Sequence, residues 1–188
     1  PVSAVVYSHS HADPWGGVRG IINEADLKSG KIPIIAPRNF MVHTISENVY
    51  AGNAMNRRLF YQYGLLLPAS PHGYVGQGLG QGVSSGAMGL IAPNRLIEQD
   101  FEEIEVDCVR MMFQDTPNTE APTEMNTYIP EMKALWMAEN VIASLHNIYT
   151  LRGAQVRDPL NWSKYIGEAL YRFGQEAEVM FASHHWPR

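Results

Sequence analysis

Apolar and polar residues along this chain follow two different periods, in segments that succeed one another. Runs typical of β-strands, either continuously apolar or alternating, occur at 2–7, 31–36, 88–92, 103–106, 109–113 and 178–182. Because these runs extend from the first residues to the last, strands are expected along the whole sequence.

Helices are expected between these strands, at 18–27, 44–63, 131–149 and 159–173. Thr44 and Glu47 have the S/T-x-x-E form of a capping box, which predicts that the second helix begins there. Asp158 precedes Pro159 as an N-cap residue precedes proline at the first helical position, and Gly174 ends the last helix. Since strands and helices alternate, the expected class is α/β or α+β, with sheets covered by helices.

The segment 64–89 has a different composition, with eight glycines and few residues suited to a core. Its GQGLGQG stretch does not contain G-x-G-x-x-G, and no clear strand precedes it, so a dinucleotide site is not expected. A loop is the plain interpretation, and a lid over a binding site is the functional alternative.

Composition narrows the class of protein. The 188 residues suffice for one domain with a sizeable core, and the net charge is −5. No basic run is longer than Arg57-Arg58, which argues against nucleic acid, and no apolar run reaches the roughly 20 residues of a membrane span. The single Cys108 excludes a C-x-x-C motif and is expected to be buried and inert. Without an initiator methionine or signal peptide, the chain is expected to be a fragment, and its localisation stays undetermined.

The stretch SHSHADPWGG carries the first candidate chemistry. His9 and His11 point to the same side of an extended chain, because strand side chains repeat every two residues, and Asp13 follows in the turn. Imidazole nitrogen and carboxylate oxygen are both zinc ligands. Two surface histidines beside a capping aspartate are the alternative that this motif alone leaves open.

Two later regions strengthen the metal interpretation. Glu120 and Glu124 lie in a Pro- and Thr-rich loop, and Glu139 lies in an apolar stretch, where an unpaired carboxylate is costly to bury. On the expected helix 131–149, His146 would share a face with Glu139, so a buried Glu–His hydrogen bond is the structural alternative. Arg152 would either cap the end of that helix or bind an oxyanion.

Taken together, several motifs resemble the alkyl sulfatases of the metallo-β-lactamase superfamily: HSHADPWGG, GNAMNRR, TEAPTEMN, PEMKALWMAENV, LHNIYTLRGAQVRD and EVMFASHHWP. The resemblance implies an αββα sandwich, here incomplete at the N-terminus, and hydrolysis of alkyl sulfates at a two-zinc centre. Full family chains are several times longer, so residues 1–188 are expected to be part of the catalytic domain. The family's dimerisation and sterol-carrier-like domains are then absent, and full-length homologues are expected to be homodimers, with a periplasmic or secreted location plausible.

The resemblance also assigns roles to single residues. It implies that His9 and His11 bind the first zinc, and that Asp13 and His184 bind the second. Glu120 and Glu139 match the family's acidic ligands, one of which bridges the ions. His146 matches a general acid for the leaving group, and Arg152 matches a sulfate-binding arginine.

Pro14 departs from the family motif HxHxDH, in which the final histidine binds the second zinc. Proline offers no side-chain donor, and it biases Asp13 toward an extended backbone. The second metal is therefore expected to bind weakly, whereas the first keeps its full ligand set. The substrate's alkyl tail needs an apolar groove, for which the candidates are Met55, Phe60, Tyr63, 65–67 and Met88.

Two rival interpretations remain beside hydrolysis of alkyl sulfates. A lactonase or phosphodiesterase of the same superfamily is disfavoured by the glutamate pair, because those families usually supply histidine or aspartate there. The other rival belongs to a different class of protein: a metal-binding fragment with impaired catalysis. It is suggested by Pro14, which stands where the family has a ligand histidine. The expected partner is a small alkyl sulfate, with neither nucleic acid nor a membrane span.

Overall fold

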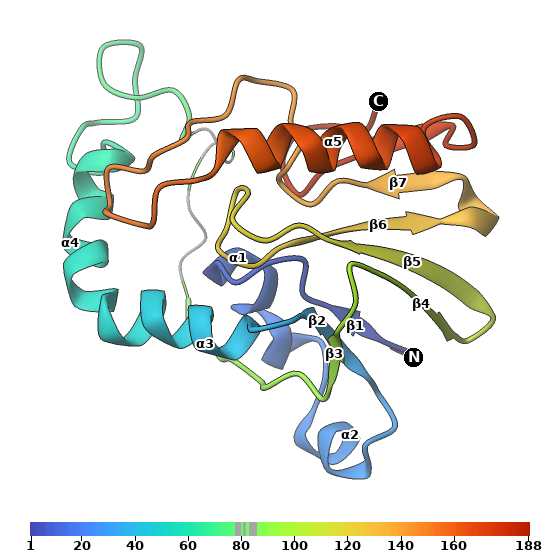
Figure 1. Ribbon diagram of the computed structural model, residues 1–188. Coiled ribbons are helices and arrows are strands. Elements are labelled where there is room, and N and C mark those ends of the chain that lie inside the picture. The colour runs from blue at the N-terminus through green and yellow to red at the C-terminus, as the bar shows by residue number, and fades with distance from the viewer. Residues whose placement is uncertain (78–79, 81, 83–85) are drawn as a thin grey trace.

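Two β-sheets and the helices that flank them form the molecule (Figure 1). The computed structural model describes residues 1–77, 80, 82 and 86–188, with the side chains of residues 24, 27 and 28 also left aside. The strands are β1 (Val5–Val6), β2 (Ile34–Pro37), β3 (Arg95–Ile97), β4 (Phe101–Val106), β5 (Val109–Asp115), β6 (Met125–Ile129), β7 (Ala134–Trp136) and β8 (Val179–Phe181). The helices are α1 (Ala12–Trp15), α2 (Glu24–Ser29), α3 (Phe40–Ile45), α4 (Gly52–Gln62) and α5 (Pro159–Phe173), with shorter or irregular turns η1 (Val18–Gly20), η2 (Ser46–Tyr50) and η3 (Pro130–Met132).

The smaller sheet, in the order β1-β2-β3, is parallel, and its central strand β2 is buried on both faces. Along β2, Ile34 and Ala36 pack with Trp15 and Phe40 against the helical layer, whereas Ile35 faces the other way. This division follows from the two-residue period of a strand. A continuous apolar run is therefore what a strand of this sheet requires.

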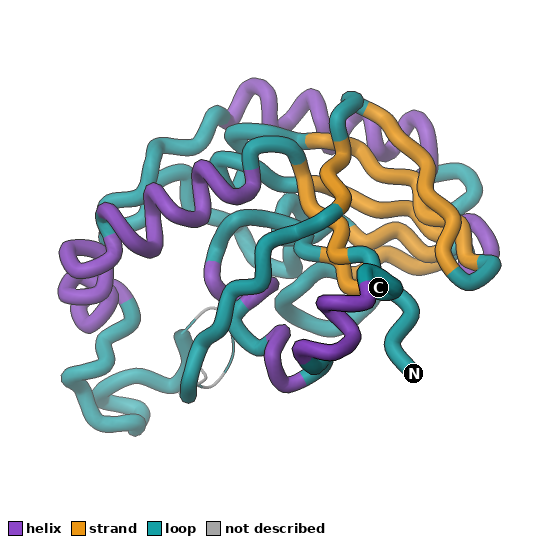
Figure 2. Tube along the Cα trace, turned by 90° about the horizontal axis from the view of Figure 1, so that it is seen from below, coloured by secondary structure: helices purple, strands orange, loops and turns teal. Residues whose placement is uncertain are grey.

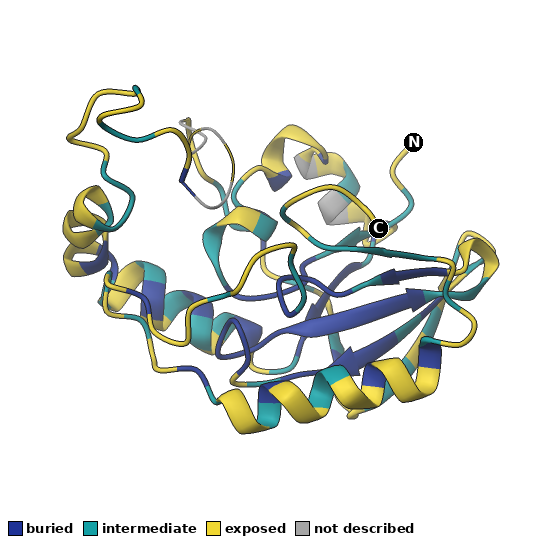
Figure 3. Ribbon diagram, turned by 90° about the horizontal axis from the view of Figure 1, so that it is seen from above, coloured by how far each residue is buried: buried dark blue, intermediate teal, exposed yellow. Residues whose placement is uncertain are grey.

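The larger sheet has the order β4-β5-β6-β7-β8, antiparallel except for the parallel pair β7 and β8. Its inner face meets the smaller sheet in a core that includes Ile35, Phe113 and Met125. Its outer face packs against α5 through Tyr128 and Phe173, whose rings stack 5.0 Å apart. The result is four layers, α/β/β/α, with buried strands beside the partly exposed α5 (Figure 3).

Several predicted elements are confirmed, above all the helix after Asp158. The Asp158 carboxylate accepts hydrogen bonds from the backbone N–H groups of Leu160 and Asn161, as an N-cap does. The predicted strands at 103–106, 109–113 and 178–182 coincide with β4, β5 and β8. The strands expected at 2–7 and 31–36 are shorter: β1 lies within the first range, and β2 begins later than expected and ends one residue beyond the second.

The helix predicted at 131–149 is wrong. The short 3-10 turn η3 is followed by Lys133, whose backbone adopts a left-handed φ of 47°, and β7 begins at the next residue. Leu135 then pairs with Tyr128 on β6 and with Met180 on β8. Residues 134–137 are good helix formers, but sheet pairing on both sides outweighs their intrinsic propensity. The chain from 141 to 157 is loop and turn.

The capping-box prediction is also wrong in its position. Helical structure begins at α3, after Asn39, so Thr44 lies inside a helix and donates its hydroxyl to the Ser10 carbonyl. Glu47 lies in the π-helical turn η2, with its side chain buried. The helix expected at 18–27 is replaced by η1 and α2, and the strand expected at 88–92 is loop.

Cys108 is exposed rather than buried, because it lies in the tight turn between β4 and β5. Asp107 and Cys108 both have positive φ, at 54° and 62°, and Val106 pairs with Val109 across them. A two-residue hairpin of this kind matches the right-handed twist of its strands. The turn therefore directs the thiol to solvent.

The strands gather at one end of the molecule, and long loops occupy the other (Figure 2). The glycine-rich segment 64–89 is loop where it is described, and residues 78–79, 81 and 83–85, on which the lid interpretation partly rests, lie outside the described residues. In the described part of the chain, none of the helices is long and apolar enough to cross a membrane.

Candidate metal centre

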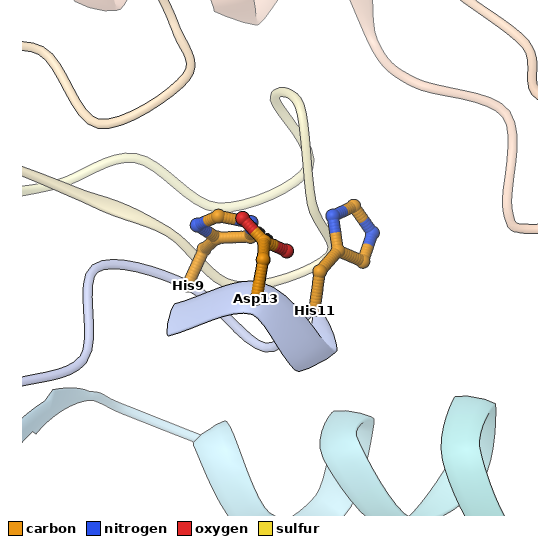
Figure 4. A group of neighbouring side chains, drawn as sticks. All are labelled: His9, His11 and Asp13. Atoms are coloured by element: carbon orange, nitrogen blue, oxygen red, sulfur yellow. Dashed lines mark ion pairs between the residues drawn. The ribbon is translucent and has the colours of Figure 1, made fainter. Parts of the chain in front are cut away.

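The chain that leaves β1 carries the first three candidate ligands. His9 is fully buried, His11 precedes α1, and Asp13 lies within this short helix (Figure 4). The two imidazole rings are 4.9 Å apart and perpendicular, and Asp13 Oδ1 is 3.7 Å from His9 Nε2. The three residues converge on one point, as the H-x-H-x-D spacing predicts.

Two glutamates reach the same point from different loops. Glu120 lies between β5 and β6, and its Oε2 is 3.7 Å from His9 Nε2 and 3.0 Å from His11 Nδ1. Glu139 lies just after β7, and its Oε1 is 3.4 Å from His9 Nε2. The helix-face argument for Glu139 is wrong, because this residue lies in a loop, but the predicted proximity to the histidines is observed.

His184 completes the cluster from the loop after β8. Its Nε2 lies 2.9 Å from Glu139 Oε1 and 3.7 Å from Asp13 Oδ2. Because β7 and β8 are parallel neighbours, their C-terminal ends meet, and Glu139 and His184 follow those ends. Parallel pairing therefore joins two residues that are 45 positions apart in the sequence.

The donor set fits a cation. His9 Nε2 is completely buried and has no hydrogen-bond partner among the described residues, although a carboxylate lies 3.4 Å away. Burying a polar atom without a partner is costly, and metal ligation would satisfy it. Three groups of donors lie within 4.8 Å: His9 with His11 and Asp13, His9 with Glu120 and Glu139, and Asp13 with Glu139 and His184. Nitrogen and carboxylate donors in this combination suit zinc.

Burial and neighbouring charges shift the pKa values of the side chains in this cluster. Burial lowers the pKa of His9 to about 4, so this imidazole is neutral, the form that binds metals. Burial also opposes charge on His11, but the adjacent Glu120 raises the pKa of His11 to about 9. Hydrogen bonds to Asp13 and Glu139 raise the pKa of His184 to about 10. Burial, with the neighbouring Glu120 and Asp13 carboxylates, raises the pKa of Glu139 above its usual range.

A cavity of about 270 Å³ opens beside Glu120 and Glu139. His146 and Arg152 both line it, as do Tyr63 and Arg157. His146 lies 5.4 Å from the Trp162 ring, and its Nδ1 is 2.9 Å from the Asn147 carbonyl. The two candidate substrate contacts are therefore next to the donor cluster. His146 lies in the segment that was predicted to be a helix, and Arg152 lies just after it.

Arg152 does not cap a helix, since the chain around it is loop. Its Nη2 lies 3.0 Å from His11 Nε2, and its backbone N–H donates to Gln62 on α4. The expected apolar groove is only partly present. Among its candidates, Tyr63 lines the described cavity, whereas Met55 is buried and Phe60, 65–67 and Met88 are exposed.

Sequence reasoning missed the contacts by which several residues hold the cluster. Arg157 donates its Nε to the Glu120 carbonyl and pairs through Nη2 with the Glu120 carboxylate. Glu47 Oε2 is 3.5 Å from His11 Nε2, on the side of the ring away from Glu120. Glu124 is buried and accepts hydrogen bonds from the backbone near both ligand glutamates. The contacts of Arg157 are set by tertiary structure, so no local pattern signals them. Glu124 was noted in the sequence beside Glu120, but its hydrogen bonds to the ligand loops are tertiary as well.

Comparison with known proteins decides the family. The sequence family model of the metallo-beta-lactamase superfamily matches residues 1–184. The chain belongs to this superfamily. Solved structures of distant members share the fold alone, for example an archaeal member from Sulfolobus tokodaii, 14% identical with a TM-score of 0.59.

More similar relatives are curated as sulfatases. A linear primary-alkylsulfatase of Pseudomonas sp is 51% identical over 187 residues, and the alkyl/aryl-sulfatase BDS1 of Saccharomyces cerevisiae is 50% identical over 187 residues. The solved structure of the sec-alkylsulfatase Pisa1 from Pseudomonas sp. has a TM-score of 0.96 and 46% identity. All three are matched over 100% of this chain, which spans only 28%, 29% and 30% of their respective lengths.

Proposed function

We propose that this chain carries the metal-binding part of an enzyme that hydrolyses alkyl sulfate esters to an alcohol and inorganic sulfate, with zinc as the metal. The convergence of six donor residues beside a cavity lined by His146 and Arg152 carries the proposal. The sulfatase names of relatives at 46–51% identity support the substrate class. The donor residues are His9, His11, Asp13, Glu120, Glu139 and His184.

The donors divide into two overlapping sets. His9 and His11, with one glutamate, would hold the first zinc, and Asp13 and His184, with a shared glutamate, would hold the second. Zinc bound in this cluster would supply Lewis acidity, which activates water near neutral pH and stabilises negative charge in the transition state. The buried, neutral His9 is ready to ligate without first losing a proton.

Arg152 and His146 would act on the two ends of the ester bond. The Arg152 guanidinium offers a planar fork for the sulfate oxygens, and its position beside His11 places that fork next to the donor cluster. His146 would give a proton to the departing alcohol oxygen, a role that typically contributes 10²–10⁴-fold. Burial lowers the pKa of His146, but the charge of a bound sulfate would favour its protonated form.

One observation favours a second candidate, a metal-binding chain with impaired catalysis. Pro14 stands where the family that this sequence resembles has a ligand histidine. The donor set for the second zinc therefore consists of three residues, Asp13, Glu139 and His184. Catalytic zinc sites usually have three protein ligands, so this set is at the minimum. Lactonase and phosphodiesterase activity remain alternatives that the same assay can separate, by comparing dodecyl sulfate with a lactone and a phosphodiester.

The deciding experiment is a zinc measurement with a matched pair of double variants. His9→Ala/His11→Ala removes two donors, and His43→Ala/His72→Ala removes two histidines outside the cluster. We expect elemental analysis to show that the first variant loses its zinc while the second retains the parent's content. Equal zinc content in both variants would contradict the metal site, and zinc without sulfate release from dodecyl sulfate would favour the impaired candidate.

A further inference from the structure

Glu124 is a buried carboxylate beside the donor cluster and does not belong to it. Glu124 is the last residue of the loop that carries Glu120, directly before β6, and it is 0% exposed. Its neighbours along the chain fix it from both sides: the Ser10 N–H donates to the Thr123 carbonyl, and the Met125 N–H donates to the Ser8 carbonyl. The backbone at Glu124 is thus attached to the segment that carries His9.

Both oxygens of Glu124 are already occupied by donors. Oε1 accepts the backbone N–H of Glu139 at 2.9 Å. Oε2 accepts the backbone N–H of Ala121 at 3.1 Å and lies 3.0 Å from the Thr119 hydroxyl, whose proton the Thr116 carbonyl shares. These oxygens face the backbone of the ligand loops, whereas Glu120 Oε2 and Glu139 Oε1 lie near His9 Nε2.

We propose that Glu124 is a positioning residue that sets the two ligand glutamates at the spacing that one metal centre requires. It is the point at which the Glu120 loop, the Glu139 loop and the His9 segment are joined by hydrogen bonds. This inference rests on the proposed metal centre. Outer-sphere partners of this kind orient ligands, and their loss typically weakens metal binding 10- to 100-fold.

A glutamine at this position can satisfy only one of the two loops. Its carbonyl oxygen can accept one backbone N–H, but its NH₂ group then faces the other backbone N–H, donor against donor. Glu124→Gln keeps the volume of the side chain, so the core around it is preserved. Met125→Ala is the matched control, because it removes a fully buried neighbouring side chain that packs between the sheets, away from both ligand glutamates.

The experiment measures the zinc dissociation constant by competition with a chelator, the visible spectrum of the Co²⁺-loaded protein, and the unfolding midpoint of the zinc-free protein. We expect Glu124→Gln to raise the dissociation constant 10- to 100-fold and to change the Co²⁺ spectrum. Met125→Ala should lower the midpoint while leaving the metal affinity and the spectrum at parent values.

A milder pair decides the question if Glu124→Gln does not fold. Thr119→Val removes the hydroxyl beside Oε2, and Thr119→Ser keeps it, so only the valine variant should bind zinc more weakly. Parent-like affinity in a folded Glu124→Gln protein, equal weakening in Met125→Ala, or no difference within the Thr119 pair would overturn the positioning role. If the parent itself binds no zinc, the proposed function fails together with this inference.

Discussion

Glu120 is in contact with a cation on each side of its carboxylate. Arg157 pairs with Oε1, and His11 Nδ1 lies 3.0 Å from Oε2. Burial would raise the pKa of Glu120, but His11, His9 and Arg157 hold it well below its usual range, so the carboxylate is charged. A charged, buried carboxylate with one oxygen directed at His9 has the charge and the direction that a metal ligand needs.

A substitution of Arg152 tests whether this single side chain binds the sulfate group. Arg152→Lys keeps the charge but loses the planar fork, so we expect kcat/KM for dodecyl sulfate to fall roughly 10-fold or more, as loss of a charge-assisted hydrogen bond predicts. Arg57→Lys, at an exposed position of α4, is the control and should retain parent kinetics. Unchanged kinetics in Arg152→Lys would show that this side chain does not bind the sulfate.

Pro14 does not turn Asp13 away, contrary to the sequence-based expectation. Asp13 lies in α1, and its Oδ2 remains 3.7 Å from His184 Nε2. Proline is tolerated there because the first turn of a helix leaves its N–H groups without intrahelical partners. The loss is therefore that of a donor atom and not of the position of Asp13.

We expect the parent to bind one zinc ion tightly and the second weakly, and Pro14→His to strengthen the second by restoring a donor. Calorimetric titration of both proteins measures stoichiometry and affinity. Two equally tight sites already present in the parent would show that Pro14 is a tolerated variation.

At the scale of elements, α5 depends on its first turn. Asp158 Oδ1 accepts from two backbone N–H groups, and its backbone N–H donates to the Asn118 carbonyl. We expect Asp158→Ala to lower the free energy of unfolding by about 1 kcal/mol, whereas Asp158→Asn keeps a capping oxygen. Lys164→Ala, at an exposed position within α5, is the control. Urea unfolding measures all three, and equal midpoints for the Asp158 variants would contradict the capping role.

Irregular backbone segments, the turn η2 and the loop after β7, position side chains of the candidate site. The π-helical turn η2 brings the side chain of Glu47 to within 3.5 Å of His11, and such turns are frequent at functional sites. Glu139 follows Ala138, whose φ is 47°, a conformation that side chains other than glycine rarely adopt. The next residue, Glu139, donates its backbone N–H to the Glu124 carboxylate.

At the scale of the whole molecule, Asp115 and Arg38 join the two sheets. Arg38 follows β2 and donates its Nε to Asp115 Oδ2, at the end of β5, at 2.6 Å. Burial raises the pKa of Asp115 from its ordinary 3.8 to about 6, although Arg38 opposes the rise. Because the folded pKa is the higher one, folding takes up a proton between these values, and this carboxyl's contribution to stability is lost as the pH rises from about 4 to 6.

We therefore expect the stability of the parent, relative to Asp115→Asn, to fall by ~1 kcal/mol per pH unit across that interval. Denaturant unfolding of both proteins at several values between pH 4 and pH 7 measures the difference. Parallel stability profiles would show that Asp115 has the same pKa in the folded and unfolded chain. The homodimer expected for full-length homologues stays a prediction at this scale.

Local patterns in the sequence determined part of this protein. The H-x-H-x-D spacing implies a shared direction for His9 and His11, and Asp158-Pro159 specifies where α5 begins, because both depend on neighbouring residues alone. The family resemblance, carried by longer motifs, identified Glu120, Glu139 and His184 as candidate ligands, which their spacing alone does not connect.

Tertiary structure decided the rest. Residues 134–136 became a strand because β6 and β8 offer hydrogen bonds on both sides, an environment that local propensity does not contain. Glu139 and His184 meet because β7 and β8 are parallel, and the Glu120 loop reaches His9 because β6 is attached to the chain after β1. These contacts join positions far apart in the sequence, as with Asp13 and His184, whose side chains approach to 3.7 Å. Such a distance is closed only when the sheets pair and pack, so the geometry of the site is a property of the folded molecule.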